Sequence, residues 1–153
     1  MQNNRNLMEI NNLTKKFKVG HGAFLHAVDK VSLNIKQGEI LGLVGESGCG
    51  KSTLGRLLIK LHKETEGSIK YNGQEITDRS FSRNMKDFRH EVQLIFQDPY
   101  SSLNPRMTIK EIICEGPDVT GLWKESEKDA KVTEWLERVG LHASHANRCQ
   151  LSL

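Results

Sequence analysis

An α/β fold is the class that this chain of 153 residues predicts, and three features of the sequence predict it. Strand-like runs dominate the first part of the chain. A glycine-rich stretch, GESGCGKST at residues 45–53, lies between an apolar run and an amphipathic helical pattern. Helical periodicity replaces β-rich sequence near residue 107. We therefore expect one α/β domain with an antiparallel β region at its N-terminus and a partial helical lobe at its C-terminus.

The composition indicates a soluble globular protein. Hydrophobic residues make up 37% and charged residues 27% of the chain, and the formal net charge is +3. No basic stripe is visible, so we expect no nucleic-acid partner. No run reaches the 18 or so apolar residues of a membrane span. The start, MQNNRNLMEI, lacks the apolar segment of a signal peptide. These features predict a cytoplasmic protein.

The strand-like runs come first along the chain. Residues 7–14 alternate partly, and residues 24–28 form a second candidate strand. Residues 31–35, VSLNI, alternate strictly between apolar and polar side chains, as expected of a half-buried strand. Gly38 then marks a turn. Residues 40–44, ILGLV, are apolar without a break, which predicts a strand buried on both faces.

The central part of the chain mixes helical and strand signals. Leucines 54, 57, 58 and 61 follow the spacing of one apolar helix face. Asn72-Gly73 separates two short strand-like runs within residues 67–76, which predicts a hairpin. Residues 82–90 are polar and suggest a short helix. Residues 92–96, VQLIF, form another candidate for a buried strand.

The last third of the chain predicts two helices after a loop at residues 98–106, which is rich in proline and serine. Thr108 and Glu111 form a capping box at the start of the first helix. Ser126 and Asp129 offer a weaker start for the second. Its expected apolar face and its terminating glycine are Val132, Trp135, Leu136, Val139 and Gly140.

The glycine-rich stretch has the residue types and spacing of a phosphate-binding loop. Gly45, Gly50, Lys51 and Ser52 match the pattern G-x-x-x-x-G-K-[ST]. Glycines let the backbone wrap closely around phosphate oxygens, and successive backbone N–H groups bind the anion. Lys51 is expected to contact the β and γ phosphates, Ser52 to bind Mg²⁺, and Thr53 to hold the α phosphate. The remaining expected contacts are Glu46, Ser47, Gly48 and Cys49.

Two longer stretches resemble the ATP-binding subunits of ABC transporters. Residues 27–61, AVDKVSLNIKQGEILGLVGESGCGKSTLGRLLIKL, are similar to the N-terminal core of that family. Residues 92–109, VQLIFQDPYSSLNPRMTI, are similar to the family's glutamine loop. The continuation DPYSSLNPR is typical of the oligopeptide, dipeptide and nickel importer group. The resemblance covers most of residues 7–140 and implies a P-loop NTPase core.

The resemblance also implies cofactors and residue roles. ATP and Mg²⁺ are the implied cofactors, with Ser52 and Gln97 as magnesium ligands. Gln97 would approach the attacking water and link the site to the helical lobe. Phe17 would stack on adenine, although a core phenylalanine is the alternative interpretation. Asp98 admits a second interpretation as a Walker B aspartate, which the following proline and the family match disfavour.

The later motifs of the family do not follow in this sequence. Leu151 and Ser152 would open the signature L-S-G-G-Q, but Leu153 stands where glycine belongs. We therefore expect the first portion of a nucleotide-binding domain, with a core at residues 1–106 and a partial helical lobe at residues 107–153. Such a chain is expected to bind ATP without hydrolysing it, so its standing as an ATPase stays open at this point.

The intact form of such a subunit is expected to couple ATP hydrolysis to uptake of peptides or nickel. Membrane permease subunits and a second ATP-binding subunit, identical or different, are the implied partners. The implied location is the cytoplasmic face of the cell membrane. Two alternatives remain: a catalytically dead nucleotide-binding fragment without a role in transport, and a soluble ABC ATPase that works outside transport.

Overall fold

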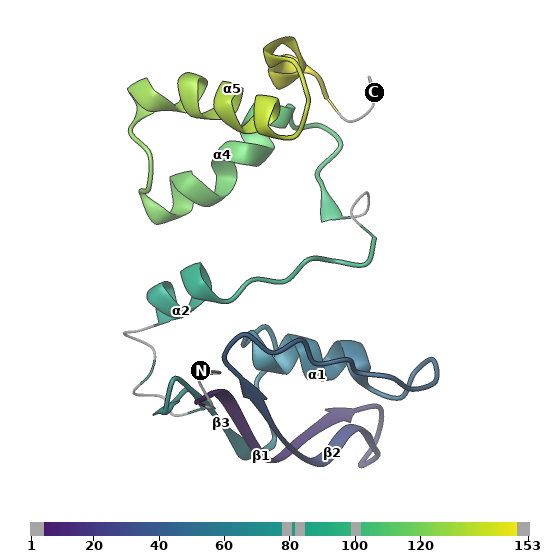
Figure 1. Cartoon of the computed structure of the whole chain (residues 1–153). Helices are drawn as coiled ribbons and strands as arrows, with labels where there is room; N and C mark the ends of the chain where they lie inside the picture. The colour runs from purple at the N-terminus through teal and green to yellow at the C-terminus, as the bar shows by residue number, and fades with distance from the viewer. Residues whose placement is uncertain (1–4, 78–80, 82–84, 99–101, 150–153) are drawn as a thin grey trace. The chain divides into compact units, whose positions relative to one another are not determined.

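The computed structural model describes residues 5–77, 81, 85–98 and 102–149. The chain divides into two compact units, residues 1–94 and 95–153 (Figure 1). The expected subdivision between residues 106 and 107 stays a prediction. The expected beginning of a signature motif at residues 151–153 lies outside the described residues, as does part of the loop at residues 98–106.

A four-stranded antiparallel sheet forms most of the first unit. Its strands are β1 (Asn6–Lys18), β2 (Phe24–Lys36), β3 (Glu66–Tyr71) and β4 (Gln74–Glu75). The order across the sheet is β2-β1-β3-β4, so the long strand β1 pairs on both sides (Figure 1). The expected antiparallel β region at the N-terminus is confirmed.

Strand β2 is one continuous element where the sequence predicted two separate strands, 24–28 and 31–35. Lys30, between them, has a φ of 47° and lies at an irregularity in the register with β1. The buried Thr14 hydroxyl accepts a hydrogen bond from the Lys30 amide at 3.0 Å. This irregularity is a β-bulge, which takes the Lys30 amide out of the hydrogen bonding between the two strand backbones. The Thr14 side chain of β1 accepts from that amide instead, and β2 continues through the bulge.

Helices α1 (Lys51–Leu58) and α2 (Met85–Glu91) also belong to the first unit. Residues from the sheet, from both helices and from the segment between β4 and α2 form one core, which comprises Met8, Ile10, Leu13, Val28, Leu54, Leu57, Ile69, Ile76, Phe81 and Phe88. The predicted hairpin at Asn72-Gly73 is confirmed, with φ values of 50° and 79° at the two turn residues. The predicted apolar helix face is only partly correct, because α1 ends at Leu58 and Leu61 is 57% exposed.

The two predicted buried strands at 40–44 and 92–96 are wrong. Neither segment forms a strand, and residues 40–44 and 93–96 are exposed, whereas Val92 is half-buried and packs against the core. Ile40 is 99% and Ile95 is 94% exposed. A strand needs hydrogen-bond partners along its edge, and no described segment pairs with either of these two. Apolar composition alone therefore did not make them strands.

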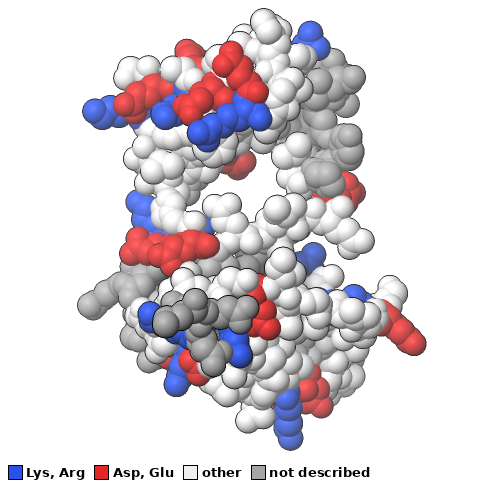
Figure 2. All heavy atoms as spheres, viewed as in Figure 1, with Lys and Arg blue, Asp and Glu red and all other residues white. Residues whose placement is uncertain are grey.

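The second unit contains the helices α4 (Ile109–Thr120) and α5 (Lys128–Arg138). Two short 3-10 helices flank α5, namely η2 (Glu125–Glu127) and η3 (Ala143–Asn147). A small core of Cys114, Val132 and Leu136 lies between the helices. Acidic and basic side chains intermingle over this unit on the face seen in Figure 2, and several of them form ion pairs.

The predicted start of α4 is confirmed. The Glu111 amide donates to the Thr108 hydroxyl at 3.2 Å, and the Glu111 carboxylate accepts from the Thr108 amide at 2.7 Å. The Thr108 hydroxyl also donates to this carboxylate, at 2.9 Å. The bond from the Thr108 amide, and after it the bond from the Thr108 hydroxyl, lower the pKa of Glu111. The capping box therefore satisfies two groups that the helix itself leaves without partners.

The predictions for α5 are correct in part. Val132 and Leu136 are buried as expected, but Trp135 is 50% and Val139 is 71% exposed. Ser126 does not cap the helix, because η2 precedes it and Glu127 takes the N-cap position. Gly140 follows the helix with a φ of 77°, which confirms the predicted end.

Candidate functional site

The predicted phosphate-binding loop connects the end of the exposed segment 40–44 with helix α1. Residues 45–49 of the loop are exposed, and the chain turns at Ser47 and Gly48 before α1 begins at Lys51. Gly50 takes the N-cap position with a φ of 98°, in the left-handed region. The loop is therefore an exposed turn that leads directly into a helix N-terminus, as the sequence predicted.

Close backbone packing explains why glycine is required at position 50. A Cβ atom at Gly50 would lie 2.0 Å from the carbonyl oxygen of Ala27, in strand β2. The start of α1 thus rests directly on the backbone of the sheet. Gly48 also has a positive φ, of 82°, but an added Cβ there would meet nothing within 4 Å. The sheet therefore constrains Gly50 by contact, whereas only backbone strain constrains Gly48.

The Lys51 ammonium group lies within the loop. It donates hydrogen bonds to the carbonyl oxygens of Gly45 at 2.7 Å and Glu46 at 2.6 Å. Its third contact is the Cys49 sulfur, at 3.4 Å. A thiol is a weak acceptor, so a phosphate oxygen would be a stronger partner for that third donor. The loop itself therefore holds a positive charge where a phosphate would bind.

The first turn of α1 supplies further donors. The first backbone N–H groups of a helix have no partner inside the helix, and Gly50 makes no side-chain cap hydrogen bond to them. The Ser52 side chain is exposed, whereas Thr53 is half-buried. Amide and ammonium groups donate to phosphate oxygens, and an accessible hydroxyl oxygen can ligate Mg²⁺. The described residues of the loop therefore fit ATP with Mg²⁺.

Phe17, the predicted adenine contact, lies on β1 and is half-buried. It pairs in register with Leu25 on β2, two residues before Ala27, whose carbonyl meets Gly50. The aromatic residue therefore lies on the part of the sheet against which the loop packs. Its ring is in edge contact with His62, with ring centroids 5.6 Å apart.

Gln97 and Asp98 belong to the second unit, at its beginning. Both are exposed, and residues 92–98 form neither helix nor strand. The structure therefore brings Phe17 and the residues of the loop together within one unit. The role of Gln97 toward magnesium stays a prediction.

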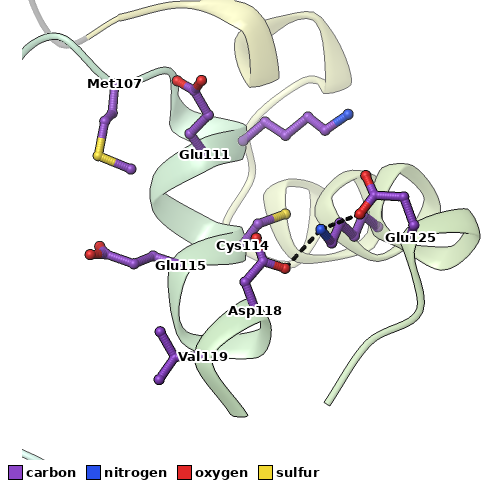
Figure 3. A pocket seen from close by; sticks show the side chains of 9 residues that line it. Met107, Glu111, Cys114, Glu115, Asp118, Val119 and Glu125 are labelled. Atoms are coloured by element: carbon purple, nitrogen blue, oxygen red, sulfur yellow. Dashed lines mark hydrogen bonds and ion pairs between the residues drawn. The ribbon is translucent and has the colours of Figure 1, made fainter. Parts of the chain in front are cut away.

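A separate hollow in the second unit is lined by more acidic than basic side chains, whereas the loop holds the Lys51 ammonium. It has a volume of about 420 Å³, and Glu111, Glu115, Asp118 and Glu125 contribute carboxylates to it (Figure 3). Lys128 lies between Asp118, at 2.8 Å, and Glu125, and the hydrogen bond with Asp118 is the first cause that raises its pKa. Because the carboxylates outnumber the lysines, this hollow does not suit a phosphate.

Sequence reasoning missed two side chains around Phe17. The Lys15 ammonium lies 4.9 Å from the centre of the Phe17 ring. Alternation along β1 would have suggested this neighbour, since residues two apart share a face of a strand. No spacing rule connects His62 with Phe17, because the two residues come from different elements.

The family model described as ABC transporter matches residues 28–153. Among curated relatives, the oligopeptide transport ATP-binding protein OppF of Bacillus subtilis strain 168 is 48% identical over 93% of this chain and 47% of its own length. The dipeptide transport ATP-binding protein DppF of Lactococcus lactis subsp. cremoris is 44% identical over 94% of this chain and 47% of its own length. The chain thus spans about half the length of the curated relatives it matches.

Solved structures resemble the fold as well. A dimeric post-hydrolysis state of the ATP-binding cassette MJ0796, bound to ADP and Pi, matches with a TM-score of 0.78 and 28% identity, over 95% of this chain and 62% of that chain. The similarity to this cassette agrees with the predicted α/β P-loop fold class. None of the described helices combines the length and the apolarity that crossing a membrane requires. With the family match over residues 28–153, we conclude that the chain belongs to the ABC transporter family.

Proposed function

We propose that this chain is the nucleotide-binding part of an ATP-binding subunit that powers import of peptides. The observation that carries the proposal is the Lys51 ammonium held inside a glycine loop at the N-terminus of α1. The names of the relatives, which are oligopeptide and dipeptide transport proteins, support peptides as the cargo. Nickel complexes are the second cargo that the sequence resemblance allows.

In this proposal, residues 45–53 bind the phosphates of ATP. Backbone amides of the loop and of the first turn of α1 contact the phosphate oxygens, and Lys51 donates to them. Ser52 and Gln97 are the proposed ligands of Mg²⁺, which when bound neutralises charge on the phosphates. Phe17 is the proposed contact for the adenine ring. Its place on the sheet that supports Gly50 agrees with this role.

We further propose that the 153-residue chain binds ATP without hydrolysing it. Hydrolysis requires a group that positions or deprotonates the attacking water. In the part of the chain that the structure describes, the Lys51 ammonium contacts two carbonyl oxygens and a sulfur, and no carboxylate. The loop therefore offers donors that hold phosphate, and such donors do not by themselves deprotonate or position the attacking water.

The proposed partners follow from the same assignment. Membrane permease subunits would carry the peptide, and a second ATP-binding subunit would complete the assembly. The dimeric state named for the solved cassette supports pairing of two such domains. The proposed location is the cytoplasmic face of the cell membrane, where the chain would bind peripherally to the permeases.

Titration of the purified chain with ATP and Mg²⁺ tests the proposal, with calorimetry as the readout. Lys51→Ala is expected to weaken binding by about tenfold or more, because it removes a charged donor. Lys86→Ala, at an exposed position of α2, is the matched control and should bind like the unchanged chain. Equal affinity in Lys51→Ala would contradict the proposed phosphate site.

Release of phosphate from ATP tests the second part of the proposal. The unchanged chain and Lys51→Ala are expected to give the same background rate. Turnover that requires Lys51 would show that the chain hydrolyses ATP by itself, and the binding-only assignment would then be withdrawn.

A further inference from the structure

The connection between α1 and β3 is tied to the part of β1 that carries Phe17. The Thr65 amide donates to the Thr14 carbonyl at 2.8 Å, and the Lys16 amide donates to the Thr65 hydroxyl at 3.0 Å. The Lys15 ammonium donates to the Lys63 carbonyl at 2.6 Å. Three hydrogen bonds thus hold residues 63–65 along one side of β1.

His62 extends this attachment to the Phe17 ring itself. The two ring planes lie at 80° to each other, in an edge contact with centroids 5.6 Å apart. The His62 amide also donates to the carbonyl of Arg56, in the last part of α1, at 3.2 Å. His62 therefore contacts the aromatic ring while its backbone is bonded to the helix that begins at Lys51.

One short helix consequently links the two halves of the proposed nucleotide site. Its N-terminus carries the phosphate loop, and His62, which follows its C-terminus, contacts Phe17. Phe17 is half-buried, so these contacts leave part of its side chain accessible. A ring that is held in one orientation before a base arrives loses less freedom when the base stacks on it.

We propose that His62 is a positioning residue for nucleobase binding and holds the Phe17 ring for adenine. This inference rests on the proposed function, in which Phe17 contacts the base. His62 acts through Phe17, and it does not contribute to binding of the phosphates.

Parallel titrations with Mg-ATP and with magnesium tripolyphosphate, which has the phosphates but no base, test the inference. His62→Ala and Phe17→Ala are each expected to weaken ATP binding by about two- to tenfold, since one aromatic contact is worth that much. Neither variant should change the affinity for tripolyphosphate. His62→Tyr keeps an aromatic ring and should restore ATP binding, whereas His21→Ala, at an exposed turn position, is the neutral control.

The possible results separate this inference from the proposed function. Loss of ATP affinity in Phe17→Ala together with unchanged affinity in His62→Ala would overturn the positioning role alone. The positioning role is also overturned if His62→Ala weakens tripolyphosphate binding equally, because His62 would then support the loop and not the base. If neither ligand binds in a Lys51-dependent way, the proposed function fails, and the positioning role fails with it.

Discussion

Residues 31–35, which alternate between apolar and polar side chains, and residues 40–44, which are apolar throughout, are separated by only four residues, and the sequence predicts a strand for each. The first run lies within β2, where Val31, Leu33 and Ile35 pair with residues of β1 and pack against the core. The second forms no strand, and its first residue, Ile40, is almost fully exposed. The more apolar of the two segments is thus the one that forms no strand, so apolar content alone does not decide strand formation here.

The two segments differ in whether another strand is available to form hydrogen bonds with them. An antiparallel neighbour can come from a nearby part of the chain through a short turn, and β1 reaches β2 through residues 19–23. A strand covered on both faces, as in a parallel sheet, needs partners that arrive by long crossovers. No described residue provides such a partner for 40–44 or for 92–96. An apolar run thus indicates a tendency to be buried, and the fold decides whether anything covers it.

The largest expected difference between the two regions comes from truncating one isoleucine in each. Ile69 on β3 is 0% exposed, whereas Ile40 is 99% exposed. Ile69→Ala should lower the free energy of unfolding by about 2–5 kcal/mol because it leaves a cavity in the core. Ile40→Ala should change it by less than about 0.5 kcal/mol. Urea unfolding followed by far-ultraviolet circular dichroism measures both values.

Tryptophan fluorescence provides the internal control for that experiment. Both tryptophans, Trp123 and Trp135, lie in the second unit. Their unfolding transition should be similar in the two variants. Equal destabilisation by Ile69→Ala and Ile40→Ala would mean that segment 40–44 is packed in solution, and the contrast between the two segments would be wrong.

A pair of glycines gives the next largest contrast. Gly67 in β3 has a φ of 90°, and an added Cβ would lie 2.4 Å from the Asn12 carbonyl oxygen. Gly67→Ala should therefore cost about 1–3 kcal/mol of stability through backbone strain and displacement of β1. An added Cβ at Gly42 meets nothing within 4 Å, so Gly42→Ala should be neutral to within about 0.5 kcal/mol. Thermal unfolding of both variants measures the difference, and a large cost at Gly42 would contradict the open surface there.

The smallest expected effect concerns acid stability of the sheet. Lys16 donates a hydrogen bond to Glu66 at 2.8 Å and also attracts its charge, and both effects lower the pKa of Glu66. A lowered folded-state pKa means that the stabilisation is present above the ordinary value of 4.5 and is lost as the pH falls through the folded-state value. Glu66→Gln should therefore flatten the loss of thermal stability below about pH 4.5.

Glu9→Gln, at a carboxylate of the neighbouring strand β1 outside this ion pair, is the matched control for the acid titration. It should leave the acid-induced loss of stability as steep as in the unchanged chain. A slope in Glu66→Gln equal to that of this control would show that the ion pair makes no contribution, which is common for exposed pairs.

Local chemistry explains which elements could be predicted. The hairpin at Asn72-Gly73, the capping box of Thr108 and Glu111, and the glycine after α5 each depend on residues a few positions apart. Their conformations follow from turn and cap preferences that act within one turn of chain. Ser126 fits the same kind of local pattern, but it does not cap α5, because the neighbouring Glu127 occupies the N-cap position.

The candidate site also has one part that the sequence predicted and another that it did not. The pattern of Gly45, Gly50, Lys51 and Ser52 predicted the loop, since phosphate binding requires those residue types at that spacing. The contact of Gly50 with Ala27 and the edge contact of His62 with Phe17 could not be predicted from spacing. Each joins elements whose meeting depends on how the chain folds back.

By itself, the sequence of this protein determined the residue pattern of the candidate phosphate-binding loop, the family resemblance and the local turns and caps. These features depend on side chains that act on backbone a few residues away. Only the tertiary structure decided that β1 pairs on both sides, that segments 40–44 and 92–96 form no strand, and that His62 contacts Phe17. The physical reason is that hydrogen-bond partners and packing neighbours come from distant parts of the chain, and a linear pattern does not specify which parts meet.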